Sequence, residues 1–85
     1  MQFEGAVVRE QGVTFGIVIV NENVLRTDYA TKEMMEFGTR AFGNMPIILM
    51  SQNSRGVPTY KGRSDIVNFL TNVDMRRIPW KRFTI

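Results

Sequence analysis

Three observations predict a small α/β (α+β) domain with a mixed sheet of four or five strands. Two apolar runs, Val13–Val20 and Pro46–Met50, are rich in β-branched residues, which is typical of strands buried on both faces. An amphipathic segment separates them, and a helix between two such strands indicates a crossover connection. With 85 residues the chain has room for one hydrophobic core, so residues 1–85 are predicted to form a single globular domain.

The first element is predicted to be a hairpin. Gln2–Val8 has moderate β propensity, and it is followed by the turn sequence Glu10-Gln11-Gly12, whose glycine can adopt positive φ. This turn leads directly into Val13–Val20. Two antiparallel strands are therefore expected at the N-terminus.

A helix is predicted next, because apolar residues recur at intervals that place them on one helix face. Thr27 or Asp28 suits the N-cap, and Gly43-Asn44 supplies a stop before Pro46. The predicted apolar face contains Ala30, Met34, Phe37 and Ala41, extended by Tyr29 and Phe42.

The second half repeats the strand and helix pattern. Ile47–Met50 is followed by a polar loop and a short strand, Val57–Lys61, which is expected at a sheet edge because Pro58 lacks an N–H donor. Ser64 is the predicted N-cap of a helix with the apolar face Ile66, Phe69, Leu70 and Val73. The predicted order is β-β-α-β-β-α, followed by a C-terminal arm, residues 74–85, alongside the sheet or forming a fifth strand. The two helices are expected on one sheet face or on both.

The segment Met45–Leu70, written MPIILM…VPTYKG…DIVNFL, resembles the second half of the thioredoxin fold. The resemblance covers residues 45–70 and implies a hairpin that is followed by a helix. Because the chain has no cysteine, it does not extend to thioredoxin-like redox activity.

The absence of cysteine and histidine narrows the possible chemistry. Disulfides, thiolate catalysis, zinc fingers and Ser–His triads are excluded. The acidic residues of the helical segments lie where helix caps and solvent-facing positions are expected, and no HExxH, GxSxG or GxxxxGK[ST] pattern occurs. We therefore expect a non-enzymatic protein without a cofactor or a metal.

The N-terminal residues have no basic segment followed by a long apolar one, and no apolar run approaches the ~20 residues that span a bilayer. The sequence thus predicts a soluble, cytoplasmic protein without a membrane partner.

The first candidate site is a polar loop after a buried strand, together with the start of the second helix. If Ile47–Met50 is parallel to its neighbour, this loop lies where ligands bind in open α/β sheets, and a helix N-terminus favours an anion. The residues predicted for a small anionic ligand are Ser51, Gln52, Asn53, Ser54, Arg55, Arg63 and Ser64. The same residues are also typical of a hairpin loop and a helix cap.

The second candidate site is the basic C-terminal third. Residues 55–85 contain seven cations and two anions, a net +5, whereas residues 1–54 contain four cations and six anions, a net −2. Cations beside aromatic residues are typical of nucleic-acid or anionic partners. The residues concerned are Arg76, Arg77, Trp80, Lys81 and Arg82. Because neighbours in an extended chain point to opposite faces, we expect these cations to be dispersed and nucleic acid to bind weakly at most.

The leading functional hypothesis is a protein-interaction or regulatory module. It is expected to form a homodimer, because two helices can barely cover both faces of the sheet and because edge strands can pair. A protein partner is also possible. Nucleic-acid binding by the C-terminal third and anion binding at residues 51–55 and 62–65 are the alternatives.

Overall fold

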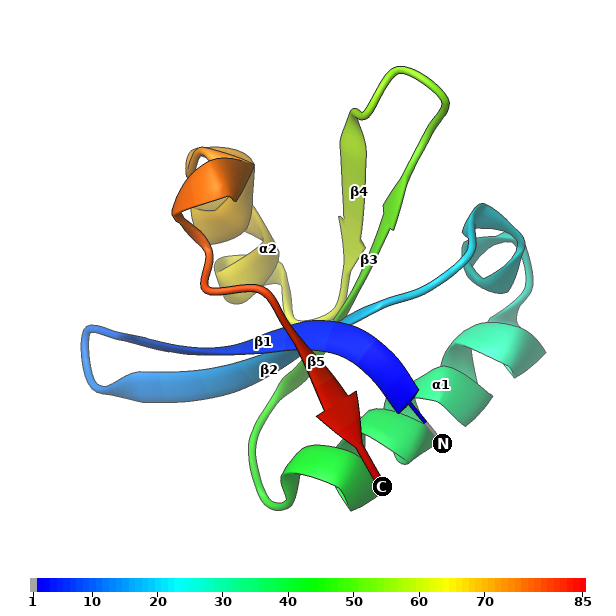
Figure 1. Cartoon of the computed structure of the whole chain (residues 1–85), viewed down its shortest axis with the longest axis horizontal. Coiled ribbons are helices and arrows are strands. Elements are labelled where there is room, and N and C mark those ends of the chain that lie inside the picture. Colours follow the sequence, from blue (N-terminus) through cyan, green and yellow to red (C-terminus); the bar gives the residue numbers. More distant parts are fainter. Residues whose placement is uncertain (1) are drawn as a thin grey trace.

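The computed structural model describes residues 2–85, which form a five-stranded mixed sheet and two α-helices (Figure 1). The predicted fold class is therefore confirmed. In chain order the elements are β1 (Gln2–Glu10), β2 (Val13–Ile19), the 3₁₀ helix η1 (Glu22–Arg26), α1 (Asp28–Phe42), β3 (Ile47–Gln52), β4 (Pro58–Lys61), α2 (Ser64–Thr71), the 3₁₀ helix η2 (Met75–Arg77) and β5 (Lys81–Thr84).

The strands lie in the order β4-β3-β2-β1-β5. β2 and β3 are parallel, as expected for strands joined by a helix, and the other neighbours are antiparallel. The predicted C-terminal arm supplies the fifth strand, which pairs with the first half of β1. β4 is an edge strand, and its Pro58 suits that position.

The two helices cover opposite faces of the sheet, so the molecule has three layers (Figure 1). Phe37 of α1 packs against Val18, Ile47 and Leu49 on one face, which we call the α1 face. Ile66 and Leu70 of α2 pack on the other face, the α2 face. The larger core on the α2 face also contains Ala6, Phe15, Ile17, Ile48, Met50 and Ile78.

Local sequence signals explain where the elements begin and end. Gln11 and Gly12 have φ values of 51° and 79°, so they form a two-residue turn of the type that matches the twist of a hairpin. The Thr27 hydroxyl accepts a hydrogen bond from the Ala30 N–H at 3.2 Å and caps α1. Gly43, with φ 85°, ends that helix.

Several details of the prediction are wrong. β1 and β3 extend further than expected, to Glu10 and Gln52, because their last residues continue the strand pairing despite being polar. Tyr29 does not extend the apolar face of α1, since 68% of it is exposed. Ser64 is not an N-cap: Arg63 holds that position, and its side chain makes no capping hydrogen bond.

The structure bears on one of the two reasons for expecting a homodimer, the cover of the sheet faces. The buried residues of β2 and β3 are at most 8% exposed, so the two helices cover both faces of these central strands and the apolar surface that a second copy was expected to cover is reduced. The two edge strands, β4 and β5, remain. Within residues 2–85 no helix has the length and apolar character required to cross a bilayer.

Tyr60 of β4 carries a buried polar atom without a partner. Its half-buried ring packs against the core of the α2 face, and among residues 2–85 its hydroxyl oxygen has no hydrogen-bond partner. Burial raises the pKa of this hydroxyl above its usual value. The oxygen has lost its contact with water and has gained no hydrogen bond in return.

We expect Tyr60→Phe to raise the free energy of unfolding by about 1 kcal/mol, because it removes a buried, unsatisfied hydroxyl and keeps the ring. Urea denaturation measures the change. Tyr29→Phe is the matched control, and it should have an effect of less than about 0.5 kcal/mol because that side chain is largely exposed. A destabilised Tyr60→Phe protein would show that the hydroxyl is hydrogen-bonded after all.

Candidate functional site

The polar loop predicted as an anion site is a hairpin turn between β3 and β4. The Asn53 side-chain oxygen accepts hydrogen bonds from the backbone N–H groups of Arg55 and Val57, at 2.9 and 3.0 Å. The Gln52 amide donates to the Gly56 carbonyl at 3.0 Å, and Ser51 lies in the strand with only 4% of its surface exposed. These side chains build the turn, as expected if the segment is a hairpin loop and not a ligand site.

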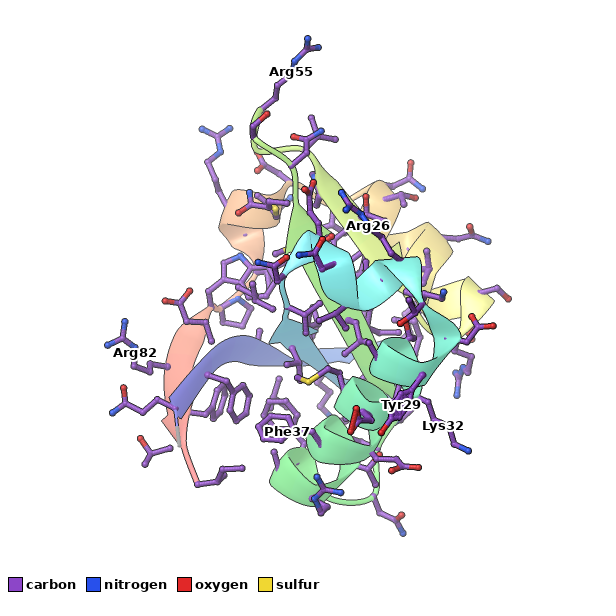
Figure 2. The ribbon with its side chains drawn as sticks, turned by 90° about the vertical axis from the view of Figure 1, so that its right-hand side faces the viewer. Arg26, Tyr29, Lys32, Phe37, Arg55 and Arg82 are labelled. Atoms are coloured by element: carbon purple, nitrogen blue, oxygen red, sulfur yellow. The ribbon has the colours of Figure 1, made fainter. Side chains whose placement is uncertain are left out.

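The structure does not bring the two parts of the predicted anion site together. β4 runs antiparallel to β3 with Leu49 opposite Lys61, so Arg63 and Ser64 follow β4 near the first residues of β3. Ser51–Arg55 lie at the opposite end, about 15 Å of strand away. Figure 2 shows Arg55 projecting alone from the tip of this hairpin. The combined anion site is therefore not formed.

Arg63 already has an anionic partner. Its guanidinium donates two hydrogen bonds to Asp65, at 2.7 and 2.9 Å, in a bidentate ion pair. The hydrogen bond from Arg63 lowers the pKa of the Asp65 carboxyl, and that from Asp65 raises the pKa of Arg63. An incoming anion at the start of α2 would have to displace this carboxylate.

The cations of the C-terminal third are dispersed, but the alternation argument applies only to Lys81 and Arg82 of β5, because Arg76 and Arg77 lie in the 3₁₀ helix η2 and not in an extended segment. Arg76 pairs with Asp74 at 2.9 Å and Arg82 lies 3.6 Å from Glu4. Arg55 and Arg82 project from different parts of the molecule (Figure 2). Lys81 lies 5.4 Å from the centre of the Phe83 ring, and Arg77 lies at the other end of the segment, near α2.

The aromatic residues of the same segment pack on the domain. Trp80 is half-buried against the core of the α2 face, and its indole N–H donates to the Met75 carbonyl at 2.9 Å. The Phe83 ring stacks on that of Phe3, with 5.3 Å between the ring centroids, and makes an edge contact with the Phe42 ring, with 5.0 Å between the centroids. These rings attach β5 to the domain instead of forming an exposed stacking platform for bases.

Asp74 provides a prediction about acid stability. Hydrogen bonds from the Arg76 side chain and backbone N–H lower the pKa of the Asp74 carboxyl to about 2. The folded state therefore binds fewer protons than the unfolded state between pH ~4 and ~2, and stability should fall as the pH falls through that range.

Asp74→Asn should reduce the slope of stability against pH in the range from 4 to 2, and added salt should reduce it in the wild type because the pair is exposed. Urea midpoints at several pH values test this. Equal slopes in the two proteins would contradict the assignment to Asp74.

A recess of the surface lies between α2 and the β1–β2 hairpin. It consists of two adjoining cavities of about 190 and 320 Å³, which share Glu10 and Phe69 as lining residues. We call this recess the α2 groove. It exists because α2 has eight residues, about 12 Å of helix, and cannot cover the longer hairpin.

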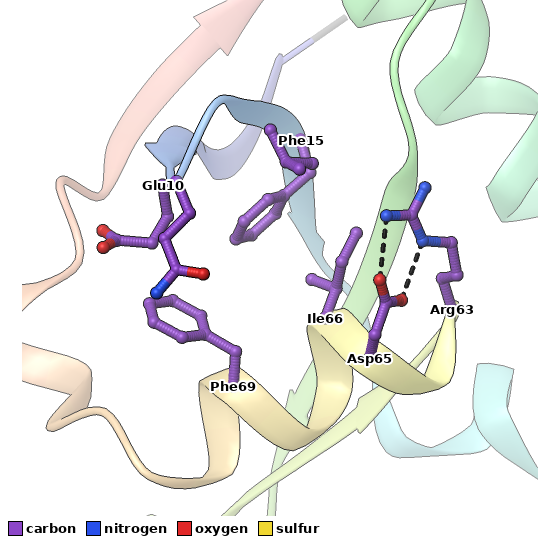
Figure 3. Close-up of a pocket in the computed structure, with 8 residues that line it drawn as sticks. Glu10, Phe15, Arg63, Asp65, Ile66 and Phe69 are labelled. Atoms are coloured by element: carbon purple, nitrogen blue, oxygen red, sulfur yellow. Dashed lines mark hydrogen bonds and ion pairs between the residues drawn. The ribbon is translucent and has the colours of Figure 1, made fainter.

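The α2 groove has an apolar floor and a polar rim. Figure 3 shows Phe15, Ile66 and Phe69 around one cavity, with the Arg63–Asp65 pair at its edge. The floor of the other cavity is formed by Val8, Phe69, Leu70 and Val73, with Glu10 and Arg77 beside them. Val8, Phe69 and Val73 are only half-buried, so apolar surface remains accessible there.

Hollows on the outer side of α1 are different in kind. They are lined by consecutive turns of that helix alone, at residues such as Lys32, Glu36 and Arg40. Figure 2 shows Tyr29 and Lys32 on this outer side. Spaces between the side chains of one helix do not make a cleft. A further hollow of about 390 Å³ is lined by Trp80 and by the charged residues Glu4, Lys81 and Arg82. The α2 groove differs from these hollows in its apolar floor, which makes it the better candidate for a binding site.

Sequence reasoning identified only part of this groove. Arg63 and Arg77 were among the predicted residues, although in two different sites. The sequence places Glu10 and Gln11 in a turn, and periodicity places Phe69 and Val73 on the apolar face of a helix. Periodicity does not reveal that this face extends beyond the strands it packs on.

Comparison with known proteins adds no identity. The chain matches no protein-family model, no curated protein and no solved structure.

Proposed function

We propose that this chain is a non-enzymatic protein-interaction module that binds a segment of a partner polypeptide in the α2 groove. The observation that supports this proposal is the groove itself, in which half-buried Val8, Phe69 and Val73 lie beneath a rim of charged side chains. An apolar centre with a polar rim is the usual composition of a protein-binding surface.

A selection from a displayed library of random twelve-residue peptides tests this function. We expect enriched peptides to bind the purified chain with micromolar Kd, and Val73→Glu to weaken them at least tenfold. Val57→Glu is the matched control, because it makes the same change at an exposed valine outside the groove. Circular dichroism checks that both variants are folded.

Two outcomes would overturn the proposed function. One is the absence of any peptide enriched above a control surface. The other is that the enriched peptides bind the Val73→Glu and Val57→Glu proteins equally well.

Nucleic acid should bind with a Kd no tighter than the 10⁻⁴–10⁻⁶ M that is typical of non-specific contacts at about 150 mM salt. Fluorescence anisotropy measures this affinity.

Self-association and a cytoplasmic location stay predictions. β4 carries Pro58 and Lys61, and β5 carries Lys81 and Arg82, which are residue types that discourage pairing between edge strands. Light scattering at micromolar concentration gives the mass in solution. Because these edges disfavour pairing between two copies, we propose that the α2 groove binds a different polypeptide.

A further inference from the structure

The edge of β1 beside the α2 groove is only half covered. Within residues 2–85, the pairing of β5 with β1 ends at Lys81 and Gly5, and no other strand continues along this edge. Continuing the same register would place Pro79 opposite Val7, but proline has no N–H to donate. The chain turns away instead, with the Trp80 N–H donating to the Ile78 carbonyl at 2.8 Å. Figure 1 shows the β1–β2 hairpin projecting beyond β5.

The register identifies which backbone groups face this open edge. The Gly16 N–H donates to the Pro46 carbonyl, so Gly16 faces β3 and its pair with Val7 in β1 is a non-hydrogen-bonded one. The N–H and C=O groups of Val7 consequently point away from β2, and by alternation those of Arg9 do too. Gly5, which has the same parity, faces β5.

We propose that the open edge of β1 at Val7 and Arg9 receives an extended segment of the partner as an added strand, whose inward side chains enter the α2 groove. This assignment rests on the proposed function and specifies how the partner binds. Val8 and Glu10 of β1 line the groove together with Ile78 and Pro79, so a strand added at the edge of β1 borders the groove. Backbone hydrogen bonds then supply affinity, and the cavities select every second side chain.

The charges around the edge indicate the composition of that segment. Ion pairs among residues 2–85 involve Arg63, Arg76 and Arg82, but not Arg9, Arg77 or Lys81. Of the acidic residues on the groove rim, Asp65 is neutralised by Arg63 and Glu10 is not. The surroundings of the open edge are therefore net positive, which favours an acidic partner.

Strand geometry places these preferences on opposite faces of the segment. Val8 and Glu10 lie on the α2 face, whereas Val7 and Arg9 alternate to the α1 face. The partner segment should therefore alternate apolar residues, which enter the groove, with polar or acidic residues, which lie beside Arg9. Val7, 38% exposed, provides additional apolar contact on that second face.

Hydrogen exchange tests the register and the binding mode together. In the free protein the amides of Val7 and Arg9 should exchange much faster than those of Val8 and Glu10. Saturation with a peptide from the library selection should slow exchange at Val7 and Arg9 at least tenfold. Unchanged exchange at both amides on binding would overturn the strand-addition proposal.

Val7→Pro is the sharpest variant, because it removes an N–H that faces the open edge while leaving the hydrogen bonds between β1 and β2 in place. We expect the selected peptides to bind it at least tenfold more weakly. Methylation of single peptide amides gives the same test without altering the protein. Methylating every second amide along the peptide should abolish binding, whereas methylating the amides between them should not. Equal sensitivity at adjacent positions would contradict strand addition even if Val7→Pro did not fold.

The composition of the peptides and a charge reversal complete the test. Enriched peptides should show apolar residues at every second position, with acidic residues between them. Arg9→Glu should weaken their binding about tenfold at low salt, whereas Arg40→Glu on α1 should not. Helical spacing of the apolar residues, or no preference for acidic ones, would overturn the inference.

The results separate failure of this inference from failure of the proposed function. If Val73→Glu abolishes peptide binding but Val7→Pro and amide methylation do not, the proposed function is supported and strand addition is refuted. A dimer that dissociates in Val7→Pro would assign the edge to a second copy and overturn the assignment to a partner. The absence of enriched peptides would refute both proposals.

Discussion

Replacing Gly5 with alanine is expected to lower the free energy of unfolding by about 3 kcal/mol, at the upper end of the usual cost of overpacking. A Cβ atom at this position would overlap the carbonyl oxygen of Ile17 on the neighbouring strand. That oxygen belongs to the backbone of β2, the middle strand of the sheet, so no change of rotamer can relieve the contact. The strands themselves would have to separate.

Urea denaturation measures this loss. It is a large part of the total free energy of unfolding, which is about 4–13 kcal/mol for a domain of 85 residues. Arg9→Ala is the control on the same strand, and it should change stability by less than about 0.5 kcal/mol because its side chain is exposed. An unchanged midpoint for Gly5→Ala would mean that β1 and β2 are further apart at this pair.

Leu70→Ala should lower the free energy of unfolding by about 3 kcal/mol, within the usual range for removing a buried leucine side chain. Leu70 is 1% exposed and belongs to the core of the α2 face. α2 has eight residues, too few for stable helix formation without tertiary contacts. We therefore expect the substitution to loosen the whole helix, and with it one wall of the α2 groove.

Thermal denaturation and hydrogen exchange of the α2 amides measure both effects. Asn68→Ala, on the exposed side of the same helix, is the control and should leave both nearly unchanged. Protection of α2 that persists in Leu70→Ala would show that Ile66 alone is sufficient to hold the helix.

The sequence was most informative where a residue pattern depends on burial alone. The run around Val18 and the run around Ile48 were predicted as strands covered on both faces, and both residues are fully buried. Thr27 and Gly43 marked the ends of α1 because caps depend on a few adjacent residues. The parallel pairing of β2 with β3 followed from the helix between them.

The candidate site was predicted poorly because it depends on how distant segments meet. The anion site required Arg55 and Arg63 to lie together, but antiparallel β4 carries Arg63 to the other end of β3. The α2 groove depends on the distance over which a short helix covers the hairpin, and the open edge on the place where Pro79 interrupts pairing. Neither is encoded in a local pattern.

The pairing of Gln2 with Thr84 has a consequence for the order in which this chain folds. The β1–β2 hairpin and the β3–β4 hairpin join neighbouring residues, whereas β5 must find β1 across nearly the whole chain. Closing a tenfold longer loop costs about 2 kcal/mol more in chain entropy. The hairpins should therefore form early, with β5 docking last, and until then the entire outer edge of β1 is available to any other extended chain.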